Sequence, residues 1–144
     1  MTVEVVERCT DDVVHAINEL IPQLSRTASE MSKQEVLSML DQPGVILFFF
    51  RAQEGGPVLG MLTLATFQIP TGRRAWIEDV VVAEDARGHG AGKALVDAAV
   101  AKAFEMGCKT VDLTSRPTRE AANRLYKRCG FELRDTNVYR FAAK

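Results

Sequence analysis

The ten residues from Asp85 to Ala94 constrain the fold of this chain most strongly. They read DARGHGAGKA and stand between an apolar run, residues 75–83, and an alanine-rich stretch, residues 92–106. Glycines at alternate positions let the backbone turn its N–H groups inward, and a helix beginning directly afterwards adds partial positive charge. We therefore predict a strand–turn–helix unit whose backbone binds an anion such as a pyrophosphate.

Two common phosphate-binding motifs do not fit this turn. A Walker A loop would need Gly at Arg87 and a hydroxyl residue at Ala94, and a dinucleotide fingerprint would need Gly at Lys93. The pattern [QR]-x-x-G-x-[GA] does fit, over Arg87, Gly88, His89, Gly90, Ala91 and Gly92. A solvated glycine-rich turn without a ligand is the alternative interpretation.

Composition favours one globular domain over residues 1–144. Hydrophobic residues make up 47% of the chain and the formal net charge is -1, so there is no broad attraction to nucleic acid or to an anionic membrane. Three cysteines without C-x-x-C spacing indicate reduced, buried thiols and no metal site. Together with an N-terminus that lacks a signal-peptide pattern, they predict a cytoplasmic location.

The pattern of apolar residues and turn residues predicts a mixed α/β order, βααβββαβαββ. Helices are expected from Thr10 to about Leu20, after Ser32, over 92–106 and over 119–129. Strands are expected over 3–8, 45–51, 58–67, 75–83, 110–114, 131–133 and 138–141. Pro22 is expected to follow the first helix.

Two motifs together resemble a known family. The first is the strand Ile77–Val82 running into the turn, and the second is ANRLYKRCGF at Ala122–Phe131, which matches A-x-x-L-Y-x-x-x-G-F. In both, the chain resembles the GNAT superfamily of acyl-CoA-dependent N-acetyltransferases, strongly from Trp76 to Phe131 and through element order before that. The resemblance implies an α/β fold with a mixed sheet of about six to seven strands flanked by about four helices.

The resemblance also implies acetyl-CoA as co-substrate and no metal. Backbone groups of Val80 and Val82 would bind the pantetheine arm, the Val80 amide would polarise the thioester carbonyl, and amides from Gly88 to Lys93 would hold the pyrophosphate. Asn123 would bind the pantetheine or cap nearby backbone. Relatives often carry Asn where this chain has Arg119, so a contact at that position is not carried over.

Tyr126 has two interpretations. The matching tyrosine of the family generally faces the sulfur of CoA, which implies that Tyr126 donates a proton to the leaving thiolate. From composition alone, Tyr126 is a half-buried structural tyrosine whose hydroxyl reaches a partner.

The base that deprotonates the amine is expected on the strand before the turn. Strict alternation would put Trp76, Glu78, Val80 and Val82 on one face, with Ile77, Asp79 and Val81 on the other. Glu78 is the candidate base and Asp79 the alternative. An ion pair between a carboxylate and Arg73 or Arg74 is the competing structural interpretation.

These residues predict an N-acetyltransferase that moves the acetyl group of acetyl-CoA to a primary amine by direct attack in a ternary complex. The expected partner is a small-molecule or peptide amine, without nucleic acid or membrane, and the chain is expected to be a monomer or homodimer. The alternatives are a catalytically silent CoA-binding regulatory module and a subunit active only within a complex.

Overall fold

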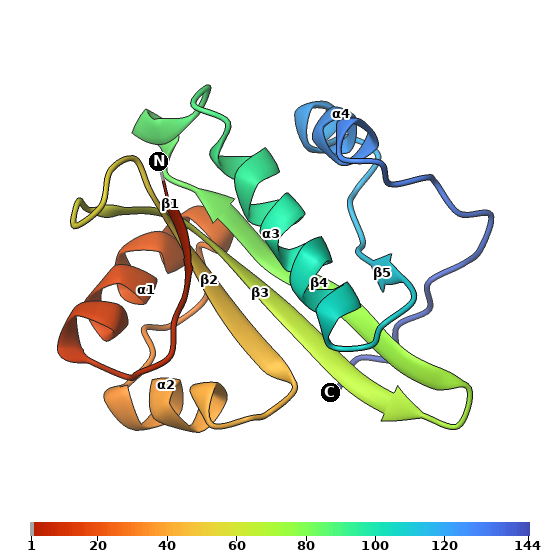
Figure 1. The fold of residues 1–144 in the computed structure, drawn as a ribbon, viewed down its shortest axis with the longest axis horizontal. Coiled ribbons are helices and arrows are strands. Elements are labelled where there is room, and N and C mark those ends of the chain that lie inside the picture. Colours follow the sequence, from red (N-terminus) through yellow and green to blue (C-terminus); the bar gives the residue numbers. More distant parts are fainter. Residues whose placement is uncertain (1) are drawn as a thin grey trace. The chain divides into compact units, whose positions relative to one another are not determined.

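The computed structural model describes residues 2–144, which divide into two compact units. The first ends at Thr114 and the second runs from Ser115 to Lys144. Each unit is described by itself (Figure 1).

The first unit is built on a five-stranded sheet in the order β1-β2-β3-β4-β5. The strands are β1 (Thr2–Val5), β2 (Val45–Arg51), β3 (Val58–Ile69), β4 (Gly72–Val82) and β5 (Val111–Asp112). Neighbouring strands run antiparallel except β4 and β5, which are parallel, so the sheet is mixed as expected. Figure 1 shows β3 and β4 as one long hairpin, which the tight turn before Gly72 closes.

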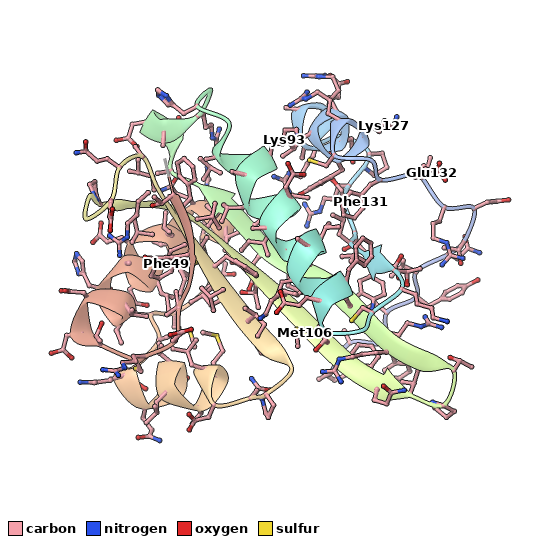
Figure 2. The ribbon with its side chains drawn as sticks, in the orientation of Figure 1. Phe49, Lys93, Met106, Lys127, Phe131 and Glu132 are labelled. Atoms are coloured by element: carbon pink, nitrogen blue, oxygen red, sulfur yellow. The ribbon has the colours of Figure 1, made fainter. Side chains whose placement is uncertain are left out.

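Two helices cover one face of this sheet. They are α1 (Asp11–Leu24) and α2 (Lys33–Leu40), and their buried Ile17, Leu20 and Val36 share one core with strand residues. The strand residues of that core are Leu47, Phe49, Met61 and Val81. Phe49, labelled in Figure 2, is 1% exposed. Helix α1 continues past Leu20, where the sequence had predicted its end, up to Leu24. Pro22 removes only one helical hydrogen bond, and the Ser25 amide still donates to the Ile21 carbonyl, so the proline does not end the helix.

The opposite face packs against α3 (Ala91–Glu105), the helix that follows the glycine turn. Leu95, Val96 and Ala99 of α3 are fully buried. A side chain at Gly60 of β3 would lie 3.2 Å from Leu95, so glycine there lets the helix approach the strand closely. This packing fixes where α3 begins, and hence where the turn lies.

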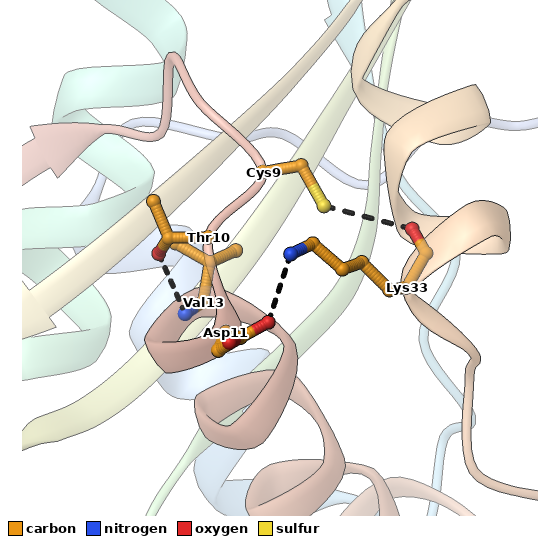
Figure 3. A network of polar contacts seen from close by, with 5 residues as sticks. All are labelled: Cys9, Thr10, Asp11, Val13 and Lys33. Atoms are coloured by element: carbon orange, nitrogen blue, oxygen red, sulfur yellow. Dashed lines mark hydrogen bonds and ion pairs between the residues drawn. The ribbon is translucent and has the colours of Figure 1, made fainter.

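Local hydrogen bonds define where α1 and α2 begin. The Thr10 hydroxyl accepts from the Val13 amide, and Ser32 and Glu35 form the expected capping box. Figure 3 shows how Lys33 ties the two helix starts together: its ammonium donates to Asp11 at 2.9 Å, and its carbonyl accepts from the thiol of Cys9 at 3.6 Å. Asp11 also raises the pKa of Lys33.

The second unit contains one helix, α4 (Glu120–Arg128), followed by a chain without strands up to Lys144. The predicted strands 131–133 and 138–141 are therefore wrong, and the sheet has five strands, fewer than the six to seven expected. Of the apolar side chains that suggested those strands, Phe131 is half-buried against Tyr126. The others are exposed: Leu133, Val138, Tyr139 and Phe141. Strand composition forms a strand only where a neighbouring strand pairs with it, and residues 131–144 have no such partner within the described chain.

The cysteines differ in burial. Cys108 is buried, as expected, whereas Cys9 and Cys129 are half-buried, so the prediction of three buried thiols is only partly right. No helix within residues 2–144 is long and apolar enough to cross a membrane. Nor do three or more His, Cys, Asp or Glu side chains gather as a metal site would need within that range.

Candidate active site

The glycine turn joins β4 to α3 as predicted. A short 3-10 turn, Glu84–Ala86, precedes it, and α3 begins at Ala91 with Gly90 as its N-cap. Gly88 and Gly90 have φ values of +88° and +75°, a region that other residues rarely adopt. A Cβ at either glycine would meet nothing within 4 Å. The glycines are therefore required by the backbone conformation and not by crowding.

The backbone amides from Gly88 to Gly92 have no backbone acceptor within the described residues. Among the backbone hydrogen bonds of residues 2–144, none is donated by an amide from Gly88 to Gly92, whereas the Ala94 amide donates to the carbonyl of Gly90. Unpaired N–H groups at a helix N-terminus form an anion site when several point to one place. The turn therefore offers several hydrogen-bond donors to an anion.

The charged side chains of the turn are exposed. Arg87 and His89 both lie at the surface, and Lys93, labelled in Figure 2 on the first turn of α3, forms an ion pair with Asp97 at 2.6 Å. A small pocket of about 110 Å³ adjoins the turn, lined by Phe50, Ala52, Leu59, Asp85, Ala86 and His89. It has room for only a few water-sized groups, and it contains neither Val80 nor Val82. His89 is therefore the one predicted cofactor residue among the six that line this pocket.

A β-bulge interrupts β4 beside the turn. Val81 is in register with Met61 and Glu78 with Thr63, so Asp79 and Val80 together oppose one residue, Leu62. Asp79 has φ +50°, the only positive φ of a non-glycine residue among those described. The bulge takes Asp79 and Val80 out of the ladder with β3.

The bulge corrects the predicted alternation. Glu78 and Val81 lie on the same face of the sheet, because Leu47 and Phe49, their neighbours two strands away, belong to one core. Strict alternation had placed Glu78 and Val81 on opposite faces. The sequence carried one signal that was missed: two polar residues, Glu78 and Asp79, precede three consecutive valines, a pattern no regular half-buried strand produces.

The other edge of β4 is unpaired along most of its length. β5 pairs with β4 only at Ala75 and Trp76. From Ile77 to Val82, β4 has no strand partner on that side within residues 2–144. The backbone groups of Val80 and Val82, the predicted pantetheine contacts, belong to this stretch.

Glu78 is exposed and forms no ion pair within the described chain. Arg73 instead donates from its guanidinium to the Thr66 hydroxyl at 2.9 Å, and Arg74 forms no ion pair in that range either. The competing interpretation of Glu78 as the structural partner of an arginine is therefore not supported.

Tyr126 is the buried residue of α4, with 8% of its surface exposed. Its ring packs edge-on against Phe131, labelled in Figure 2, with centroids 6.1 Å apart. Burial raises the pKa of the Tyr126 phenol, while the nearby Arg119 opposes that shift. No hydrogen bond to the hydroxyl is found within residues 2–144, so the structural tyrosine with a bonded hydroxyl is not what is observed. Burial therefore favours the neutral, protonated form of Tyr126.

Asn123 has a local partner. Its side-chain amide donates to the carbonyl of Arg116 at 3.0 Å, the backbone capping that the sequence allowed as one alternative. Arg119 is the N-cap residue of α4 without a side-chain capping bond.

The Acetyltransferase (GNAT) family model matches residues 14–131, which is most of the chain. The chain belongs to this family. The match includes both predicted motifs, so the family resemblance and the α/β fold are confirmed. The GNAT family assignment supports an acetyltransferase, with acetyl-CoA as the co-substrate that the family typically uses.

Solved structures agree with the GNAT assignment. A protein of Agrobacterium tumefaciens str. C58 described as an acetyltransferase is 28% identical, with a TM-score of 0.84 over 99% of this chain and 100% of that one. An aminoglycoside acetyltransferase from an uncultured soil metagenomic sample, solved with sisomicin, is 17% identical with a TM-score of 0.84 over 99% and 95%. Glucosamine-6-phosphate N-acetyltransferase from Arabidopsis thaliana is 20% identical with a TM-score of 0.79 over 98% and 99%. The search of curated proteins found no match.

Proposed function

We propose that this chain transfers the acetyl group of acetyl-CoA to a primary amine by direct attack within a ternary complex. The observation that carries the proposal is the turn at Gly88–Gly92, whose amides have no backbone acceptor within residues 2–144 and lead into the N-terminus of α3. The acetyltransferases of this family typically use a CoA thioester as the acetyl donor. The turn suits the pyrophosphate of that CoA molecule.

The proposed cofactor contacts are mainly backbone groups. Amides from Gly88 to Lys93 bind the pyrophosphate, with the Arg87 and His89 side chains exposed beside them. The unpaired edge of β4 at Val80 and Val82 offers hydrogen bonds to an extended chain, as a strand would. Acetyl-CoA, when bound, supplies the acetyl group as a thioester.

The chain supplies the proton transfers. Glu78 takes the proton from the incoming ammonium, directly or through water, because a protonated amine has no lone pair for attack. The Val80 amide, outside the ladder with β3, donates a hydrogen bond to the thioester carbonyl oxygen. Tyr126, which burial keeps in its protonated form, donates its phenolic proton to the departing thiolate.

The proposed acceptor is a small-molecule or peptide amine. Structural neighbours include an enzyme solved with the aminoglycoside sisomicin and an enzyme named for glucosamine 6-phosphate, which supports a small amine. We further propose that residues 1–144 act as one cytoplasmic domain, as a monomer or homodimer and without a metal.

The test is an acetylation assay on the purified chain. Acetyl-CoA is mixed with a panel of amines and peptides, thiol release is followed, and CoA affinity is measured by calorimetry on the same preparation. Amine-dependent thiol release supports the proposal. CoA binding without release on any amine would instead indicate a regulatory module, and activity appearing only after lysate is added would indicate a complex-dependent subunit.

A further inference from the structure

Three side chains stand together on the open part of the sheet. Trp76 of β4 is in register with Asp112 of β5, and Glu78 lies two residues further along β4. Residues in register on neighbouring strands face the same way, as do residues two apart on one strand. We call Glu78, Trp76 and Asp112 the acceptor row; it lies entirely within the unit that ends at Thr114.

The face of the acceptor row is the one that α1 and α2 cover further along. Glu78 is in register with Thr63, and Thr63 with Leu47, which belongs to the core under α1 and α2. Helices α1 and α2 do not extend over the acceptor row. Glu78 is exposed, Trp76 and Asp112 are half-buried, and Phe67 on the same face is 44% exposed.

The charges of the acceptor row are not compensated within the protein. Neither Glu78 nor Asp112 forms an ion pair within residues 2–144, and Trp76 has no aromatic partner there. Arg74, two residues before Trp76 on the same face, is exposed and also forms no ion pair in that range. An aromatic ring between two uncompensated carboxylates is suited to a cation with an apolar stem.

The distance between the two carboxylates is large enough for each to bind a different nitrogen. Strands lie about 4.8 Å apart and two residues span about 6.6 Å, so the Cα atoms of Glu78 and Asp112 are roughly 8 Å apart. If Glu78 takes the proton of the reacting amine, Asp112 is left as a second, separate site for a positive charge. Trp76 lies beside both.

We propose that the acceptor carries two positive charges, and that Asp112 is the positioning residue that binds the ammonium that does not react. The inference rests on the proposed function and specifies its substrate class as a diamine or longer polyamine. Glu78 meets the reacting amine, Trp76 contacts the carbon chain between the two nitrogens, and Asp112 fixes its far end. Asp112 takes no part in proton transfer.

The first test compares 1,5-diaminopentane with 1-aminopentane, which share a chain length and differ by one charge. We expect the wild type to show a KM lower by about tenfold or more for the diamine, the range of a charge-assisted hydrogen bond. Asp112→Asn should remove that difference with kcat little changed, and Asp112→Glu should restore part of it. Asp41→Asn, which removes an exposed carboxylate at the C-cap of α2, is the matched control and should change neither KM.

The second test measures binding without turnover. Calorimetry of both amines against the CoA-loaded protein should show the diamine preference in wild type and its loss in Asp112→Asn. Equal affinity for the two amines in wild type would overturn the inference, and so would an equal loss for both in the variant. If monoamines are acetylated and diamines are not preferred, the inference is overturned and the proposed function stands. If no amine is acetylated, the proposed function is overturned. In that case the binding of the diamine to wild type and to Asp112→Asn still decides the role of Asp112.

Discussion

The glycine turn and the acceptor row differ in which atoms do the binding. The turn from Gly88 to Gly92 offers backbone amides, and apart from the buried Ala91 its side chains are exposed or absent. The acceptor row offers two carboxylates and an indole on a sheet whose backbone is largely paired at Trp76. Backbone donors are the same in every sequence that can adopt the turn, whereas a row of side chains changes with each residue. The comparison teaches that one fold can keep its site for the acetyl donor while its site for the amine acceptor changes.

Removing the Tyr126 hydroxyl should have the largest effect. Tyr126→Phe keeps the ring and its packing on Phe131, and kcat should fall about 10- to 1000-fold, the range of general acid catalysis. CoA affinity and Tm should stay nearly unchanged. Tyr139→Phe, at the exposed second tyrosine, is the control. A lowered Tm with wild-type kcat would make Tyr126 structural.

The raised pKa of Tyr126 adds a pH signature to this variant. Above the ordinary tyrosine pKa of about 10, the unfolded chain loses the phenolic proton while the folded chain still holds it. The wild type therefore loses stability as pH rises through that window, since the folded state binds more protons. Tyr126→Phe should lose less over the same window, which thermal unfolding at pH 9 to 11 would show.

Glu78→Gln tests the side-chain half of the comparison. It should lower turnover by about 100-fold at neutral pH, with partial recovery at high pH, where the free amine is abundant. Asp79→Asn is a clean companion variant, because asparagine tolerates the positive φ of that position. If Glu78→Gln follows the wild-type pH profile and Asp79→Asn does not, the base is Asp79; if both follow it, no carboxylate on β4 acts as base.

Gly90→Val tests the backbone half. The substituted side chain has open space around it within the protein, so it should obstruct only a ligand, and CoA affinity should fall by about tenfold or more. Gly55→Val is a matched control, because Gly55 has a φ of +76°, also with nothing within 4 Å, and lies in the β2–β3 hairpin. Both variants carry the same backbone strain. Equal CoA affinity in a folded Gly90→Val protein would contradict the phosphate assignment.

Ser32→Ala should have the smallest effect and should leave both regions intact. It removes one of the two bonds of the capping box that begins α2, the one that the Ser32 hydroxyl accepts from the Glu35 amide, at a cost of about 1 kcal/mol in the free energy of unfolding. The other bond, from the backbone amide of residue 32 to the Glu35 carboxylate, stays available. These bonds to Ser32 lower the pKa of Glu35, so their contribution is present above the ordinary glutamate pKa and is lost as pH falls through the lowered one. Ser38→Ala in the middle of α2 is the control. A change in CoA affinity in Ser32→Ala would show that the turn depends on α2.

Much of the fold was predictable because its signals are local. Capping residues, the β2–β3 turn and the glycine stops after α3 and α4 each act within a few residues, and all were located correctly. Apart from the end of α1, misjudged at Pro22, the failures are non-local. The segments 131–133 and 138–141 have strand composition, but a strand needs a partner, and composition does not supply one.

The candidate site divides along the same line. Arg87 to Lys93 could be located from the sequence because glycine spacing dictates the backbone itself. Asp112 could not, because nothing near it in the chain distinguishes it from a surface aspartate. Its significance comes from register with Trp76, a residue 36 positions earlier in the sequence, which β5 reaches only after α3 has crossed the sheet.

The sequence by itself determined most of the helices and strands, the glycine turn and the family, since backbone conformation at glycines and helix caps is set by neighbouring residues. Only the tertiary structure decided the bulge at Asp79 and Val80, which places Glu78 on the same face as Val81. Only the tertiary structure decided that Glu78, Trp76 and Asp112 share that face. The physical reason is that the direction of a side chain on a sheet depends on pairing, and pairing is settled by the packing of distant segments.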